Sequence, residues 1–126
     1  MEKSFANYPS LRGKNILITG GASGIGKELV KAFAEQESNV AFLDLNAVAG
    51  EELCLDIGKN VFFEKCDLRE VDKLKSSIEK LRSKLGLFDV LVNNAAHDDR
   101  HKWQDVTEEY WDERFATNLR HHFFTI

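Results

Sequence analysis

The chain has 126 residues, a hydrophobic fraction of 43% and a formal net charge of −4 at pH 7, so it has room for one domain or part of a larger one. Because acidic residues outnumber basic ones, the chain lacks the positive charge that favours nucleic-acid binding. No apolar run is long enough to span a bilayer. The first residues lack the apolar core of a signal peptide, which makes the cytoplasm the expected compartment. Two cysteines are too few for a disulfide framework, so we expect Cys54 and Cys66 to be reduced, buried thiols.

The first strand, turn and helix form the most informative stretch. Residues 1–12 are a polar lead-in whose proline argues against regular structure, and we expect a surface strap. Residues 15–18 are a short, β-branched apolar run that predicts a strand covered on both faces. A helical pattern starts at Ile25, and the turn before it is rich in glycine, with Gly20, Gly24 and Gly26. The turn would therefore present free backbone N–H groups and the positive end of a helix dipole to a phosphate.

The second predicted strand ends on an acidic residue. Residues 39–44 are a buried-strand run that finishes at Asp44, about twenty residues after Gly26, as a dinucleotide-binding fingerprint requires. A carboxylate at this position accepts hydrogen bonds from the adenosine ribose hydroxyls and repels a 2′-phosphate. Residues 45–47 contain no Arg or Lys, so NAD is favoured over NADP.

The rest of the chain continues the alternation of strand and helix. A weakly patterned helix over 47–56 leads to a third strand over 61–66. Apolar residues at steps of three and four predict a helix over 71–85, and a fourth strand follows over 88–92. A polar loop then precedes a last helix that Thr107 can cap. The apolar positions of that helix recur at near four-residue spacing, at Trp111, Phe115, Leu119 and Phe123.

Strands that alternate with helices predict a parallel sheet built from right-handed βαβ units. We therefore predict a three-layer α/β fold of the doubly wound Rossmann type, with strand order 3-2-1-4 over residues 13–126. The carboxyl ends of the strands meet at one edge of such a sheet, where Asp44, Asp67 and Asn94 would lie beside the glycine turn. The expected ligand is the pyrophosphate of a dinucleotide.

Two motifs resemble those of the short-chain dehydrogenase/reductase family. Residues 19–26, Thr-Gly-Gly-Ala-Ser-Gly-Ile-Gly, are similar to the T-G-x-x-x-G-x-G turn of that family. Residues 93–95, Asn-Asn-Ala, are similar to its N-N-A-G segment, with Ala96 in place of the glycine. The resemblance extends over residues 11–126 and implies a Rossmann-type fold and an oxidoreductase that uses a nicotinamide cofactor.

The resemblance also implies roles for individual residues. Asp67 would bond the adenine amino group, and Asn118, in the last helix, would anchor a water of the proton relay and kink its helix. The alternative for Asn118 is a side chain that only satisfies a local helix defect. In the same helix, His121 and His122 are expected at the surface or at an interface. The residues expected to bind the cofactor are Gly20, Ser23, Gly24, Ile25, Gly26, Asp44, Asp67, Leu68, Asn94 and Ala95.

Within the family, the loop and the last helix resemble NAD-dependent members that oxidise the anomeric hydroxyl of an aldose, such as D-xylose, to a lactone. Residues 98–102, Asp-Asp-Arg-His-Lys, and residues 110–114, Tyr-Trp-Asp-Glu-Arg, carry this similarity. We expect Asp99 and Arg100 to meet sugar hydroxyls at the mouth of the site, with a solvated loop as the alternative. The expected partners are a sugar and further copies of the full-length chain, as a dimer or tetramer.

The catalytic serine and the Tyr-x-x-x-Lys of the family lie beyond the matching positions of this sequence. Neither Tyr8 nor Tyr110 has a lysine four residues on. We therefore expect the 126 residues alone to lack the C-terminal half of the fold, to be inactive and to be marginally stable. The alternatives are a chain that only binds the dinucleotide, or one that acts by pairing with another protein.

Two further patterns point to other chemistry. Residues 21–27 fit the G-x-x-x-x-G-K opening of a nucleotide triphosphatase loop, but Glu28 stands where that loop needs a hydroxyl for magnesium. Residues 97–101 contain both His and Asp, yet adjacent loop residues rarely converge on one ion, and Arg100 would oppose a cation. We therefore expect neither a triphosphatase nor a metal site.

Overall fold

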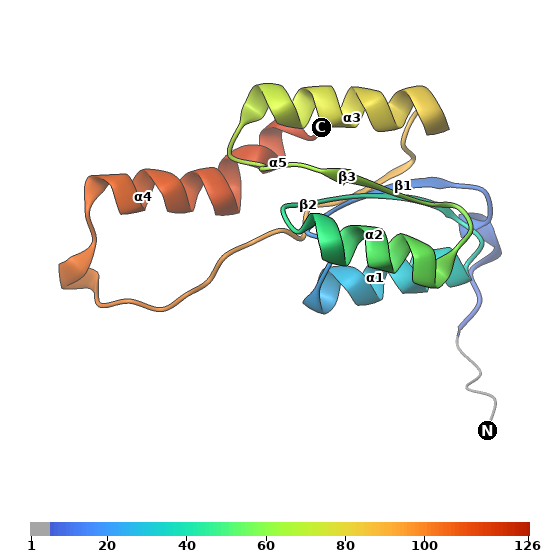
Figure 1. Ribbon diagram of the computed structural model, residues 1–126, viewed down its shortest axis with the longest axis horizontal. Coiled ribbons are helices and arrows are strands. Elements are labelled where there is room, and N and C mark those ends of the chain that lie inside the picture. Colours follow the sequence, from blue (N-terminus) through green and yellow to red (C-terminus); the bar gives the residue numbers. More distant parts are fainter. Residues whose placement is uncertain (1–5) are drawn as a thin grey trace.

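The computed structural model describes residues 6–126, in which a four-stranded parallel sheet lies between two layers of helices (Figure 1). The strands are β1 (Asn15–Thr19), β2 (Asn39–Asp44), β3 (Val61–Lys65) and β4 (Val90–Val92). The helices are α1 (Gly24–Glu35), α2 (Ala47–Ile57), α3 (Val71–Leu85), α4 (Glu108–Phe115) and α5 (His121–Phe124). Short turns complete the set, with 3-10 geometry in η1 (Pro9–Leu11) and η2 (Trp103–Asp105) and π geometry in η3 (Ala116–Arg120).

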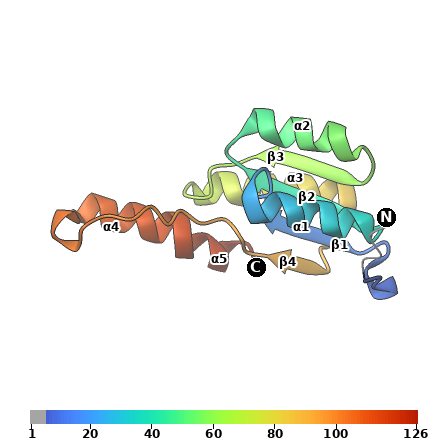
Figure 2. The same ribbon diagram turned by 90° about the horizontal axis from the view of Figure 1, so that it is seen from below.

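The strand order β3-β2-β1-β4 confirms the predicted doubly wound sheet (Figure 2). β1 pairs in parallel with β2 along its whole length and with β4 from Ile16 to Ile18. The carboxyl ends of all four strands therefore meet at one edge of the sheet.

The two faces of the sheet form separate halves of the core, because successive residues of a strand point to opposite sides. The face beneath α1 and α2 buries Ile16, Ile18, Val40 and Phe42 against Val30 and Leu53. The face beneath α3 buries Leu17, Ala41 and Leu43 against Leu74 and Leu81. This arrangement confirms the three-layer prediction.

The helix boundaries follow the local chemistry of the sequence. Asn46 and Thr107 cap α2 and α4, and the side chain of each accepts a backbone N–H at 3.1 Å. Gly58 and Gly86 follow the last residues of α2 and α3. The predicted spans of these two helices and of β2 are thus reproduced to within a residue.

Some local predictions were wrong. Pro9 does not exclude regular structure but begins η1, because its fixed φ suits the first position of a helix. The predicted strap also included residues 1–5, which lie outside the described residues. β3 ends at Lys65, one residue early, and β4 starts only at Val90. The N–H of Asp89 donates to the carbonyl oxygen of Asn15 at 2.8 Å, but the N–H of Asn15 donates to the carboxylate of Asp89, also at 2.8 Å, so a side chain replaces one of the backbone acceptors there.

The last helix is not continuous α-helix. The π turn η3 interrupts it, so that α4 projects away from the sheet and α5 returns beside α3 (Figures 1 and 2). A π turn contains an extra residue and therefore rotates the face that the following residues present. The expectation that His121 lies at the surface or an interface was wrong, because the residue is 0% exposed and its ring lies 3.2 Å from the carbonyl oxygen of Ala95. The apolar positions at four-residue spacing remain exposed instead, at Trp111, Phe115, Leu119 and Phe123.

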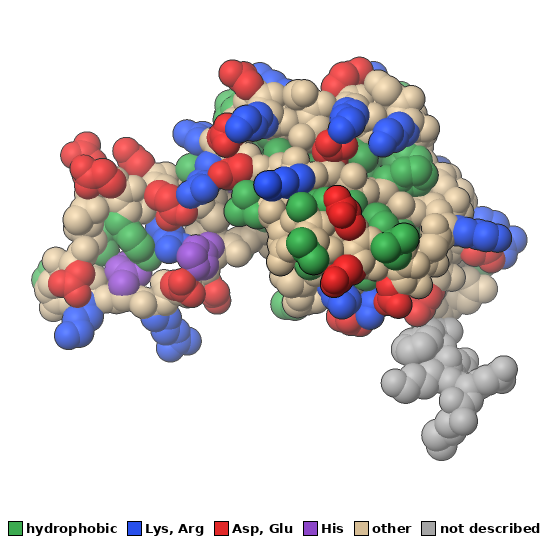
Figure 3. All heavy atoms as spheres, viewed as in Figure 1, with side chains coloured by type: hydrophobic (Ala, Val, Ile, Leu, Met, Phe, Trp, Pro, Cys, Tyr) green, Lys and Arg blue, Asp and Glu red, His purple; other side chains and the backbone are tan. Residues whose placement is uncertain are grey.

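The surface and the thiols add three observations. Acidic and basic side chains are intermixed on the face drawn in Figure 3. None of the helices in residues 6–126 combines the length and the apolar character needed to cross a bilayer. Cys66 is buried and Cys54 half-buried, both thiols are free, and burial raises the pKa of each, so neither is activated as a thiolate.

Candidate dinucleotide site

The turn between β1 and α1 requires glycine. Gly20 has a φ of 69°, a conformation that side chains rarely adopt. A Cβ on Gly26 would overlap the carbonyl oxygen of Gly20 and lie 2.6 Å from Nδ2 of Asn94. Ser23, with an exposed side chain, holds the N-cap position of α1. The first N–H groups of α1 have no intrahelical acceptor, which suits this helix end to an anion.

The residues after β4 are tied to this turn through Thr19, which is fully buried at the end of β1. Its hydroxyl oxygen accepts the N–H of Asn94 at 3.0 Å and that of Ala95 at 3.1 Å. The side-chain nitrogen of Asn94 donates to the carbonyl oxygens of Thr19 and Gly20, at 3.0 and 3.1 Å. These bonds join the end of β1 to the residues that follow β4.

Asp44 is fixed at the end of β2. Its carboxylate accepts the backbone N–H of Ala22, in the glycine turn, at 3.0 Å and that of Asn46 at 2.9 Å. Each carboxylate oxygen has about two acceptor positions, so both oxygens can accept further hydrogen bonds from hydroxyl groups.

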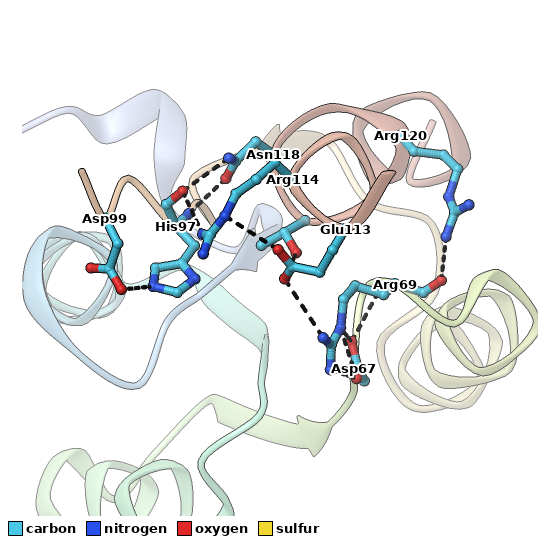
Figure 4. Close-up of polar contacts among 9 residues, drawn as sticks. Asp67, Arg69, His97, Asp99, Glu113, Arg114, Asn118 and Arg120 are labelled. Atoms are coloured by element: carbon cyan, nitrogen blue, oxygen red, sulfur yellow. Dashed lines mark hydrogen bonds and ion pairs between the residues drawn. The ribbon is translucent and has the colours of Figure 1, made fainter. Parts of the chain in front are cut away.

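Asp67, just after β3, is paired with Arg69 (Figure 4). Nε of Arg69 lies 2.9 Å from Oδ1 of Asp67, and Nη2 lies 2.6 Å from Oδ2. These hydrogen bonds hold the pKa of the Asp67 carboxyl below its usual value. Arg69 also lies 3.6 Å from the carboxylate of Glu113, which accepts the Thr117 hydroxyl at 2.9 Å. Charged groups thus link the loop after β3 to α4.

A cavity of about 710 Å³ lies at the carboxyl edge of the sheet. Every residue that the sequence predicted to bind the cofactor lines it, drawn from the ends of all four strands. Its volume falls within the range of about 300–1,000 Å³ that is typical of small-molecule sites. The other lining residues are Leu45, Cys66, Arg69, Ala96, His97, Asp98, Glu113 and Thr117.

The residues predicted for catalysis and for the sugar lie next to this lining rather than in it. Asn118, in the π turn, accepts the N–H of His97 at 2.6 Å and donates to its carbonyl oxygen at 2.9 Å (Figure 4). Its side chain therefore holds the loop after β4 and does not merely satisfy a helix defect. Asp99 lies 2.6 Å from Nε2 of His97, and Arg100 is exposed.

Sequence reasoning missed the polar side of the cavity, where the ion pair of Arg69 with Glu113 is extended by the Thr117 hydroxyl. Glu113 and Thr117 are one helical turn apart and so share a face, but no local pattern indicates that α4 reaches the cavity. Within residues 6–126, no three His, Cys, Asp or Glu side chains are grouped to hold a metal ion.

Comparison with known proteins places this geometry in a family. The family model described as short chain dehydrogenase matches residues 14–126. The chain is 46% identical over 123 residues to a probable galactose dehydrogenase of Rhizobium meliloti, covering 94% of this chain and 48% of that protein. It is 44% identical over 124 residues to the D-xylose 1-dehydrogenase of Caulobacter vibrioides, covering 96% and 48%. The chain thus spans about half the length of the curated relatives it matches.

Solved structures give the same result. A mutant of a Serratia marcescens short-chain dehydrogenase/reductase superposes with a TM-score of 0.86 at 29% identity, covering 93% of this chain and 49% of that one. A 3-ketoacyl-(acyl-carrier-protein) reductase from Brucella melitensis, complexed with NADH, superposes with a TM-score of 0.84 at 28% identity, covering 90% and 48%.

Proposed function

The chain belongs to the short-chain dehydrogenase family, and on that premise we propose that it forms the NAD-binding part of an oxidoreductase that converts an aldose to its lactone. The observation that carries the proposal is the cavity at the carboxyl edge of the sheet. There, the N-terminus of α1, the Asp44 carboxylate and the turn after β4 converge on one space.

The residues of the cavity fit a dinucleotide. Gly26 lets the first turn of α1 pack against the Gly20 carbonyl, where a Cβ would collide, and no atom of the described chain lies within 4 Å of a Cβ built on Gly24, so backbone N–H groups of α1 can hold the pyrophosphate. Asp44 would accept the adenosine ribose hydroxyls, while Asn94 and Ala95 would meet a ribose. Leu68 would flank the adenine through its backbone. The bound cofactor would supply the hydride acceptor, and the protein supplies position and electrostatics.

The charges of the cavity support NAD over NADP. The Asp44 carboxylate would repel a 2′-phosphate. Arg69 is the permanent cation among the lining residues within 6–126, and it is already paired with Asp67 and faces Glu113. A guanidinium held by two carboxylates offers little attraction to a further anion. Adenine would have to share Asp67 with Arg69, because each carboxylate oxygen of Asp67 already accepts two hydrogen bonds from Arg69.

An aldose is the substrate that the relatives favour, because the names of two of them specify galactose and D-xylose. In this proposal Asp99 and Arg100, on the loop that leaves the cavity at His97 and Asp98, hold the sugar hydroxyls. Asn118 positions this loop through its two bonds to His97 and anchors a water of the proton relay. The family's serine and Tyr-x-x-x-Lys would complete the reaction.

The proposal is tested with the protein as its source produces it. D-Xylose, D-galactose and non-sugar alcohols are each supplied with NAD or NADP, and formation of the reduced nicotinamide is followed by absorbance. We expect turnover with an aldose and NAD, and a raised KM for the sugar in Asp99→Ala and Arg100→Ala. Turnover with non-sugar alcohols alone, or an unchanged sugar KM in both variants, would contradict the aldose assignment.

Dinucleotide binding without turnover is the second candidate, because the residues that line the cavity are those expected to bind the cofactor, whereas Asn118, Asp99 and Arg100 lie outside the lining. Binding of NADH by a protein that shows no turnover with any sugar would favour it.

Self-association of the full-length protein is supported by an exposed apolar stripe on the last helix, made of Trp111, Phe115, Leu119 and Phe123. Trp111 and Phe123 of that stripe are 57% and 74% exposed. Sedimentation equilibrium should then give a dimer or tetramer, whereas a monomer at micromolar concentration would argue against it.

A further inference from the structure

The extended segment after β4 is held from two opposite sides. On the side of the sheet, the Thr19 hydroxyl accepts two of its N–H groups. On the other side, the helical stretch from η3 to α5 bonds alternate residues of the segment in antiparallel order. The three contacts are Asn118 with His97, His121 with Ala95, and Thr125 with Asn93.

The three contacts come from one face of the helical stretch, because residues 118, 121 and 125 are three and four positions apart. They reach the side chain of Asn93 and the main chain of Ala95 and His97. Of the three segment residues, Ala95 and His97 line the cavity, whereas Asn93 lies outside the lining. The contacts at Ala95 and His97 therefore bear on the cavity wall, whereas the contact at Asn93 does not.

His121 makes this middle contact under unusual conditions. It is 0% exposed, and its Nε2 lies 3.2 Å from the carbonyl oxygen of Ala95. Its other ring nitrogen, Nδ1, is buried and has no hydrogen-bond partner among the described residues. Burial, with His122 close by, lowers the pKa of the ring. A neutral ring has one N–H. The Ala95 carbonyl oxygen lies within hydrogen-bond distance of Nε2, whereas the Thr117 carbonyl, one helical turn earlier, lies near the ring without meeting hydrogen-bond geometry at Nδ1, so we assign the N–H to Nε2.

We propose that His121 is a positioning residue of the dinucleotide site, whose Nε2–H fixes the Ala95 carbonyl and thereby sets the main chain of residues 94–96 against the cavity. The inference rests on the proposed function and deepens it. An apolar side chain at position 121 would leave that carbonyl without its partner, and the segment could turn away from the ligand.

The test compares four variants in the protein as its source produces it. His121→Leu removes the donor, and His121→Asn shortens the side chain so that its amide falls short of Ala95. His121→Gln keeps an N–H donor close to the position of Nε2. Thr125→Val is the matched control, because it removes a bond from the same helix to Asn93, outside the cavity. The dissociation constant for NADH is measured by calorimetric titration, with the melting temperature of each variant alongside.

We expect His121→Leu and His121→Asn to weaken NADH binding about tenfold, which corresponds to about 1.4 kcal/mol. His121→Gln should restore binding to within about twofold of the unchanged protein, and Thr125→Val should bind equally well even if it melts earlier. If His121→Leu does not fold, the contrast between the Asn and Gln variants decides.

Three results would overturn the inference alone: unchanged binding in His121→Leu or His121→Asn, failure of His121→Gln to restore it, or equal weakening by Thr125→Val. The last result would show that docking of the helix as a whole controls affinity. Failure of the unchanged protein to bind NADH would overturn the proposed function as well.

Discussion

Replacing Gly26 with Ala tests the glycine turn most severely. The new Cβ would overlap the carbonyl oxygen of Gly20 and lie 2.6 Å from Nδ2 of Asn94. That nitrogen donates to the carbonyl oxygens of Thr19 and Gly20 at 3.0 and 3.1 Å. The substitution therefore forces the ends of β1 and β4 apart at the point where they are joined.

The magnitude follows from these contacts. Two strained or broken hydrogen bonds cost about 1 kcal/mol each, and the forced shift of a packed backbone costs about 1–3 kcal/mol more. Alanine regains up to about 1 kcal/mol over glycine inside a helix. The free energy of unfolding should thus fall by roughly 2–4 kcal/mol, which lowers the melting temperature by about 10 °C in a domain of this size.

Gly24→Ala is the matched control for this prediction. Gly24 has a φ of 53°, and no atom of the described chain lies within 4 Å of a Cβ built there. Its substitution adds backbone strain of about 1–2 kcal/mol but no clash. Thermal melts by circular dichroism and NADH titration compare the two variants. Equal melting temperatures for Gly26→Ala and the unchanged protein, with equal NADH affinity, would refute the assigned role of the turn.

Three further predictions concern charge. Asp44→Asn should weaken NAD binding about tenfold and reduce the preference over NADP, because the repelling charge is lost, and titration with both cofactors measures this. Arg69→Gln should raise the pKa of the Asp67 carboxyl toward its ordinary value, as followed by NMR, yet lower stability by less than about 1 kcal/mol because the pair is partly exposed. Burial lowers the pKa of His121 from the usual 6.5, so the unfolded chain binds a proton first on acidification. The contribution of the neutral ring to the free energy of unfolding is fully present above about pH 6.5 and is lost as the pH falls. Urea denaturation should therefore show that the free energy of unfolding falls more steeply with decreasing pH in the unchanged protein than in His121→Gln.

The sheet could be predicted from the sequence because its signals are local. β1 and β2 are continuous apolar runs. The alternation of strands with helices permits few topologies, so the order β3-β2-β1-β4 follows from general rules. The helix at residues 71–85 could be placed from its apolar spacing and from Gly86. These features depend on neighbours in the sequence or on the handedness of the chain.

The last helix shows where this reasoning stops. The resemblance predicted a kink at Asn118, and the π turn at Ala116–Arg120 contains that residue. The apolar spacing did not indicate which face of the helix meets the sheet, and the burial of His121 depends on the docking of α5 beside α3, which has no local signature.

The candidate site divides in the same way. The glycine turn and Asp44 could be assigned from spacing, because a phosphate-binding turn imposes its residue types on adjacent positions. The pairing of Arg69 with Glu113 joins residues on separate elements and depends on where α4 lies. A contact of this kind becomes visible only once the helix is placed in three dimensions.

The central claim is that the cavity at the carboxyl edge of the sheet holds NAD. It is tested most directly by titrating the protein, as its source produces it, with NADH and NADPH in parallel, using Gly26→Ala as the control. The account predicts one site per chain, at least about tenfold tighter for NADH, which the control loses. Equal or tighter binding of NADPH, or binding that Gly26→Ala leaves unchanged, would contradict it.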